Sequence, residues 1–197
     1  LSEARSHLEE SLRSAQQIGH SFLTGLGYMH LAYYWLVLKE WERSLEYGQR
    51  GLEIFQELGS QENLIDTYVS VSEAWLGQGN LENAQTACDA IENLLAEART
   101  EEAGPNLQQA RALRLYGSLR RAQGDFTTAF DLFNASAQQF TSLDNQLELG
   151  RTLAELASLS HAGGDLVAAG SYASQARAIF AGLGAALDLQ TIENARY

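Results

Sequence analysis

Large apolar residues recur along the chain at a nearly constant interval, each of them directly after a short polar turn. Trp41, Leu81, Phe126 and Leu166 follow turns that contain Lys-Glu, Gly-Asn, Gly-Asp and Gly-Asp, and these four anchors lie 40, 45 and 40 residues apart. The extra five residues fall in the segment 98–105, which we expect to form an insertion loop. An interval of this size is typical of helical repeat proteins, in which each repeat is one supersecondary unit.

Small and large side chains occupy the same positions of every repeat when the repeats are aligned on the four anchors. A small residue stands three positions after each anchor and a large apolar one fourteen positions after it. The positions thirteen, ten and nine before each anchor hold a large, a large and a small residue. The first two columns contain Ser44, Ala84, Ala129 and Ala169, then Phe55, Leu95, Phe140 and Phe180; the others contain Tyr28, Leu31 and Ala32, then Tyr68, Val71 and Ser72, then Leu113, Tyr116 and Gly117, then Leu153, Leu156 and Ala157.

These columns predict a pair of antiparallel helices in every repeat. Apolar residues three and four positions apart form a stripe along a helix, and small residues let two helix axes approach closely. Gly with Asn or Asp supplies a turn that tolerates left-handed backbone angles and caps the next helix. Because one pair cannot bury its own apolar face, neighbouring pairs must stack into a continuous core.

The pattern assigns helix to nearly the whole chain. No window alternates apolar and polar residues as a half-buried strand does, and Pro105 is the single proline. The expected pairs are 20–38 with 41–58, 60–78 with 81–98, 106–123 with 126–143, and 145–162 with 166–183. They belong to units 20–59, 60–105, 106–144 and 145–184, while 1–19 fits the second helix of a truncated unit and 185–197 the first helix of another. We therefore expect one all-α domain over 1–197.

This order of large and small residues resembles the tetratricopeptide repeat over essentially the whole chain. The resemblance implies a right-handed α-solenoid of antiparallel helix pairs, a TPR-like superhelix of about nine to ten helices. Two features depart from the family: the repeat is nearer 40 than 34 residues long, and its units close with Leu58-Gly59, Leu143-Asp144 and Leu183-Gly184 where a proline is usual. In this longer, proline-poor form the chain is similar to the helical arrays of MalT-like bacterial transcription regulators.

The charge of the chain excludes some classes of partner. Twenty-five acidic and thirteen basic residues give a formal net charge of −12, which repels phosphate backbones and anionic membrane surfaces. No apolar run approaches the ~18–20 residues that cross a bilayer, and one cysteine, Cys88, is compatible with a reducing compartment. We expect a cytoplasmic protein that binds neither nucleic acid nor membrane directly.

The sequence begins in mid-unit, at Leu1. Leu8 and Leu12 near the start have no predicted partner helix, whereas the terminal units of a free-standing solenoid need polar outer faces. We therefore expect a piece of a longer array, whose exposed terminal helices could also associate between copies.

Five of the thirteen basic residues gather in one segment of this acidic chain. Arg111, Arg114, Arg120 and Arg121 share one predicted helix, and Arg151 lies near the start of the first helix of the next unit. The spacing places three of them, at 111, 114 and 121, on one helical face. In tetratricopeptide arrays the first helix of each pair lines the concave groove, which makes Arg111, Arg114, Arg121 and Arg151 candidates for binding a carboxylate or phosphate. The alternative is that they pair with Asp or Glu residues of the adjacent helix.

The groove has a different character in the first complete unit. An apolar and aromatic stripe lines it there, made of Leu26, Met29, Tyr33 and Leu36. Such a stripe could hold an amphipathic partner helix, or it could pack against a preceding helix. Glu73 and Asp66 would make the next stretch acidic, so that the groove runs from apolar through acidic to basic.

Other chemistry finds little support in the sequence. The four histidines, His7, His20, His30 and His161, are not spaced as zinc ligands, and no glycine segment has the spacing and lysine of a phosphate loop. Cys88, Trp35 and Trp75 fall in core columns of the repeat. We expect no catalytic residues, no metal, no cofactor and no enzyme activity. The carboxylate clamp of chaperone-binding relatives is also absent, because its lysine and asparagine positions hold Met29 and Tyr33, Val69 and Glu73, and Arg114 and Ser118.

Two functions fit these observations. The first is a protein–protein interaction scaffold whose concave groove binds a peptide or helix of a partner, with an acidic segment as the preferred ligand; its binding residues are Arg111, Arg114, Arg121, Arg151, Met29, Tyr33, Leu36 and Glu73. The second is a ligand- or protein-sensing regulatory module of a larger bacterial signalling protein or transcription regulator. An enclosed apolar pocket would favour a small ligand, and an open groove would favour a peptide.

Overall fold

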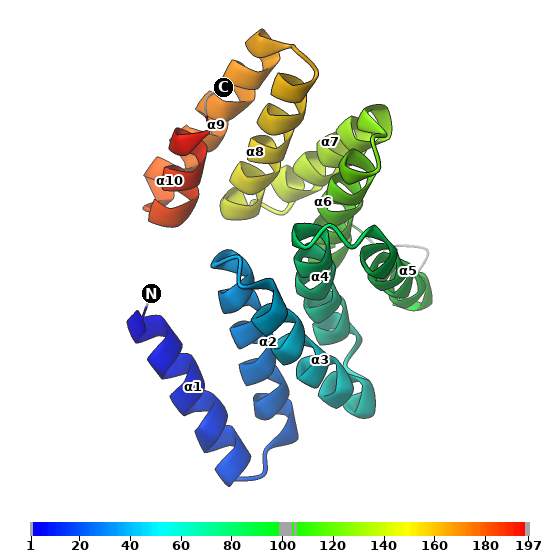
Figure 1. Ribbon diagram of the computed structural model, residues 1–197, viewed down its shortest axis with the longest axis vertical. Helices are drawn as coiled ribbons and strands as arrows, with labels where there is room; N and C mark the ends of the chain where they lie inside the picture. The colour runs from blue at the N-terminus through cyan, green and yellow to red at the C-terminus, as the bar shows by residue number, and fades with distance from the viewer. Residues whose placement is uncertain (1, 99–103, 105, 196–197) are drawn as a thin grey trace. The chain divides into compact units, whose positions relative to one another are not determined.

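The computed structural model describes residues 2–98, 104 and 106–195, and within these ranges every regular element is an α-helix (Figure 1). The described part of the chain contains ten of them: α1 (Ser2–Gln17), α2 (Ser21–Val37), α3 (Trp41–Leu58), α4 (Gln61–Gly77), α5 (Leu81–Ala98), α6 (Leu107–Ala122), α7 (Phe126–Ser142), α8 (Gln146–Ala162), α9 (Leu166–Leu183) and α10 (Ala186–Asn194). The prediction of an all-α fold with nine to ten helices is confirmed.

The helix boundaries lie within two residues of the predicted ones. Helices α3, α5 and α9 cover the predicted ranges 41–58, 81–98 and 166–183 without a difference. The agreement has a local cause, because each of these helices begins at an anchor that directly follows a turn. The insertion loop predicted over 98–105 lies almost wholly outside the described residues.

The chain divides into two compact units, residues 1–100 and residues 101–197. In the first unit α2 pairs with α3 and α4 with α5, while α1 packs on α2; in the second, α6 pairs with α7 and α8 with α9, while α10 packs on α9. Consecutive pairs meet through α3 and α4 in one unit and through α7 and α8 in the other. The first helices also touch one another, α2 with α4 and α6 with α8. Each unit is therefore a stack of antiparallel helix pairs.

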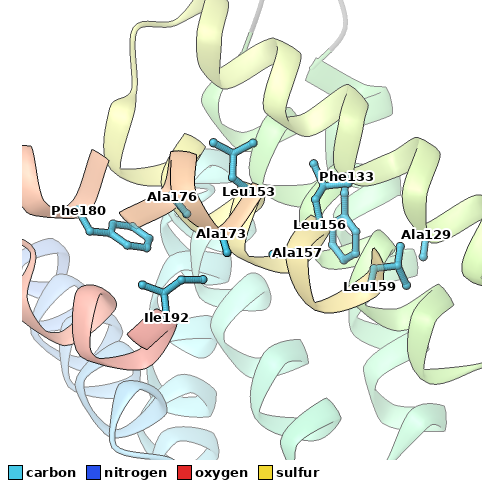
Figure 2. Packing of buried hydrophobic residues seen from close by; sticks show 10 residues of the cluster. All are labelled: Ala129, Phe133, Leu153, Leu156, Ala157, Leu159, Ala173, Ala176, Phe180 and Ile192. Carbon is cyan, nitrogen blue, oxygen red and sulfur yellow. The ribbon is translucent and has the colours of Figure 1, made fainter. Parts of the chain in front are cut away.

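Small residues lie where the helices approach, as the repeat predicts. The residues three positions after the anchors, Ser44, Ala84, Ala129 and Ala169, are all 0% exposed. Ala129 belongs to a core cluster of the second unit that also contains Phe133 and Phe180 (Figure 2). Gly117 serves the same purpose, because a Cβ atom there would lie 2.7 Å from the Phe133 ring. Small side chains thus set the distance between the two helices of a pair.

The turn that precedes each second helix uses left-handed backbone, as predicted. Gly79, Gly124 and Gly164 have φ angles of 75°, 86° and 83°. After Gly124, the Asp125 carboxylate accepts a hydrogen bond from the Thr128 N–H at 3.1 Å and caps α7. The left-handed glycine ends one helix and the aspartate cap starts the next within a few residues. This short connection fixes the antiparallel arrangement of the pair.

Lys39 occupies the equivalent turn position in the first pair, with a φ of 59°. A left-handed conformation costs a residue with a Cβ atom ~1–2 kcal/mol, which exceeds the extra chain entropy that glycine loses on folding. We expect Lys39→Gly to raise the free energy of unfolding by about 0.5–1 kcal/mol, measured by urea denaturation. Lys39→Ala removes the same charge and keeps the Cβ atom, so an equal gain in that variant would contradict the backbone explanation.

Candidate functional site

The arginines predicted to line the groove of the second unit lie in ion pairs between successive first helices. Arg111 Nη2 and Arg114 Nη1 on α6 lie 3.5 Å and 2.6 Å from the carboxylate oxygens of Glu148 on α8. Arg121 on α6 donates to Glu155 on α8 at 2.5 Å. The face that holds these arginines therefore points toward the neighbouring first helix, as the ion-pair alternative in the sequence analysis anticipates.

Glu148 is the centre of this arrangement and is only 6% exposed. Arg151 Nη1, one helical turn further along α8, donates to Glu148 Oε1 at 3.3 Å. Burial alone would raise the pKa of the Glu148 carboxyl, but the positive charges of Arg114, Arg151 and Arg111 outweigh burial and hold that pKa below its ordinary value. The group is therefore ionised at neutral pH, stabilised by nearby opposite charge.

Arg151 extends the ion pairs to the last helix of the unit. Its Nε and Nη2 atoms donate to the two carboxylate oxygens of Asp188 on α10, at 2.8 Å and 3.3 Å. Such a two-pronged contact fixes the plane of the guanidinium group. One row of charges thus crosses α6, α8 and α10, and we call it the charged row; it consists of Arg111, Arg114, Arg121, Arg151, Glu148, Glu155 and Asp188.

Buried aromatic rings lie beneath two members of the charged row. The guanidinium carbon of Arg114 lies 5.6 Å from the centroid of the Phe140 ring, and that of Arg121 lies 5.8 Å from the centroid of the Phe133 ring. Both phenylalanines are 0% exposed. A cation above an aromatic face is favoured electrostatically. The aromatic rings of the core and the carboxylates of α8 therefore both position these arginine side chains.

The apolar stripe of the first unit is mostly part of the core. Leu36 is buried, and Met29 and Leu26 pack against a cluster that contains Phe55. Tyr33 is the exposed member, at 41%. Of the predicted acidic stretch, Glu73 and Asp66 are half-buried on α4. The structure therefore leaves Tyr33 as the accessible part of this stripe.

In the ranges 2–98 and 106–195 no three His, Cys, Asp or Glu side chains come together in a way that could hold a metal ion. Across the same ranges, no helix is long and apolar enough to span a bilayer. Cys88 is buried, as predicted, with its Sγ atom 3.5 Å from the Ser72 hydroxyl.

Sequence reasoning raised acidic partners for the arginines only as an alternative and did not identify which residues they are. A signal was present: Arg114 and Glu148 are separated by 34 residues, and so are Arg121 and Glu155. That common separation joins equivalent faces of two successive first helices. Reasoning from the repeat also assigned Trp35 to the core alone, which its 6% exposure confirms, and missed two arginines that lie over its ring, Arg5 and Arg43.

Comparison with known proteins identifies the fold. No protein-family model matches the chain, and no curated protein matches it by sequence. Among solved structures, a Rap protein complexed with Competence and Sporulation Factor is similar with a TM-score of 0.77 and 15% identity, over 95% of this chain and 51% of that one. BtubC (BKLC) from P. vanneervenii is similar with a TM-score of 0.66 and 17% identity, over 96% of this chain and 85% of that one.

At these identities the similarity concerns the fold, which is that of a TPR-like helical repeat solenoid. The chain spans about half the length of the Rap protein that it matches. The predicted helical-repeat architecture is confirmed at this level.

Proposed function

We propose that this chain is a non-catalytic binding module that holds a segment of a partner protein against the first helices of its repeats. Helical repeat arrays build extended surfaces of this kind from their stacked units. The solved Rap structure with a similar fold contains a bound factor, which supports a binding role for the architecture. We also propose that the protein acts in the cytoplasm and that copies associate through their terminal helices.

The observation that carries this proposal is the charged row of the second unit. It gathers four guanidinium groups on two successive first helices of a chain whose net charge is −12. The side chains of Arg111, Arg121 and Arg151 are 27%, 30% and 25% exposed, so a partner carboxylate can reach them. Their internal partners already fix these side chains, which lowers the entropy lost when a ligand binds. The expected ligand is an acidic peptide segment.

Arg111 is the best position at which to test this proposal. Its contact with Glu148 is the longest of the three, at 3.5 Å, and Arg114 and Arg151 still neutralise that carboxylate when Arg111 is removed. We expect peptides selected on the wild-type chain from a random display library to be rich in Asp and Glu. Arg111→Gln should weaken their binding about tenfold, the loss of one charge-assisted hydrogen bond of ~1.4 kcal/mol, measured by isothermal titration calorimetry.

Arg120→Gln is the matched control. Arg120 lies on the same helix, is exposed, and donates to Gln123 rather than to a carboxylate of the charged row. The two variants lose the same charge, so equal weakening in both would show that net charge alone attracts the peptides. Failure to select any peptide, or selected peptides that bind Arg111→Gln as tightly as wild type, would contradict the proposal. Replacing Arg111, Arg114 and Arg121 together is less informative, because it leaves Glu148 with a single counter-ion.

A second proposal is that the chain is the sensing part of a larger bacterial regulator of the MalT-like kind. The long, proline-poor repeat supports this reading. In such a protein the bound ligand would change the stacking of the repeats. Hydrogen exchange of α8 and α10 with and without a selected peptide tests it: unchanged protection would leave a passive scaffold.

A further inference from the structure

A hollow of about 510 Å³ lies in the first unit where α1, α2 and α3 meet. Arg5 and Glu9 reach it from α1, Tyr34 and Trp35 from α2, and Arg43 from α3. The guanidinium carbon of Arg43 lies 4.5 Å from the centroid of the Trp35 ring, and that of Arg5 lies 5.4 Å from it. Two cations are thus gathered on a single indole ring, inside a concave site.

The charges in this hollow do not balance. Arg5 Nε donates to Glu9 Oε1 at 2.8 Å, so one positive charge is neutralised. Across the described residues Arg43 has no ion pair and no hydrogen bond, and its interaction there is with the Trp35 ring. A chain with a net charge of −12 therefore keeps, in the same hollow as Arg5, a second arginine without a carboxylate partner among the described residues. This is the arrangement that a bound anion completes.

Two aromatic residues, Tyr34 and Trp35, line the hollow. The Trp35 residue is 6% exposed, and its Nε1–H is buried without an acceptor among the described residues. A buried donor of this kind is uncommon in native proteins and calls for an explanation, such as a group missing from the structure. The Tyr34 ring meets Trp35 edge-on, with centroids 5.1 Å apart and an interplanar angle of 81°. Two rings thus offer an apolar wall beside the positive charge.

We propose that this hollow binds a small organic anion, with its carboxylate or phosphate group between Arg5 and Arg43 and its apolar part against Tyr34 and Trp35. The volume falls in the range of ~300–1,000 Å³ that small-molecule sites occupy. Planar guanidinium groups bind both kinds of oxyanion through paired N–H donors. The site belongs to the first unit and uses none of the residues of the charged row, so it stands independently of the peptide-binding proposal.

The Trp35 indole N–H signal can report occupancy, because Trp35 lines the hollow. The chain has three tryptophans, so its ¹⁵N-labelled form gives few indole signals, and the one lost in Trp35→Phe is that of Trp35. Citrate and inorganic phosphate are the two probes, with sodium chloride at equal ionic strength as the blank because salt screens exposed charges. We expect the Trp35 signal to shift saturably with citrate, with phosphate or with both, which also tells a carboxylate site from a phosphate site.

Arg43→Gln should weaken the probe's binding at least tenfold, and circular dichroism verifies that this surface variant is folded. Arg50→Gln is the control, because Arg50 lies on the same helix, carries the same charge and pairs with Glu46 outside the hollow. The control should bind the probe as wild type does. Absence of a saturable shift with either probe, or equal weakening in the Arg43 and Arg50 variants, overturns the proposal. Should Arg43→Gln fail to fold, Arg43→Lys keeps the charge and removes the planar donor pair, and wild-type affinity in that variant overturns the proposal equally.

Discussion

Replacing Ala169 by leucine is expected to lower the free energy of unfolding by ~1–3 kcal/mol, the usual cost of overpacking a filled core. Ala169 lies in the first turn of α9, three residues after its anchor, and is 0% exposed. Three additional carbon atoms at this position must either push α9 away from its neighbours or force side chains from their preferred rotamers. Interiors are packed as densely as organic crystals, so neither adjustment is free. The midpoint of urea denaturation, followed by circular dichroism, measures the loss.

Ala178→Leu provides the matched control on the same helix. Ala178 is exposed, and alanine and leucine are both strong helix formers, so this substitution should leave the midpoint nearly unchanged. The Ala129→Leu variant repeats the test one pair earlier, at a residue that is also 0% exposed. Equal midpoints for Ala169→Leu and Ala178→Leu would show that the helices of a pair do not make their closest contact at the small residues.

The repeat made the helices and their ends predictable because both have local causes. A period of three to four residues shows in the sequence, and so do the turn and the cap at each anchor. The same reasoning could not predict how deeply each anchor is buried. Trp41 is half-buried, with its ring against Gly77 of the next first helix, whereas Phe126 and Leu166 are 55% and 61% exposed. An aligned column marks where a helix begins, but the neighbour that covers it belongs to another helix.

At the candidate site, too, the sequence predicted what depends on a single helix and not what depends on the packing of two helices. Helical spacing placed Arg111, Arg114 and Arg121 on one face, which the contacts of α6 with α8 confirm. Which charges oppose that face depends on how two first helices align, and no local pattern fixes that alignment. Three cationic neighbours offset the cost of burying the Glu148 carboxylate. The sequence of its own helix gives no sign of that burial, because Glu148 looks there like a polar residue of the first turn. Binding of an acidic partner to this row stays a prediction.

Glu148→Gln is expected to be among the most destabilising single changes in the second unit, at about 2–3 kcal/mol. Removing one partner of a buried ion pair costs ~3–5 kcal/mol. Because the arginines are partly exposed, solvent screens their charges and reduces this cost. The variant removes the carboxylate shared by Arg111, Arg114 and Arg151, while its amide keeps the shape of the side chain. Glu155→Gln is the control on the same helix. Its ion pair with Arg121 is about a third exposed, so the substitution should cost less than ~1 kcal/mol.

The effect of pH on Glu148→Gln tests the cause of this loss. The pKa of Glu148 is lowered in the folded chain, because the charges of Arg114, Arg151 and Arg111 outweigh a burial that would raise it. A carboxyl whose folded pKa lies below its unfolded value, about 4.3 for glutamate, stabilises the fold fully above that value. Its contribution disappears as the pH falls through the folded pKa. The gap between wild type and Glu148→Gln in urea midpoint should therefore be widest near neutral pH and shrink below about pH 4. A gap that keeps its size down to pH 2 would mean that the glutamine acts through packing and not through the lost charge.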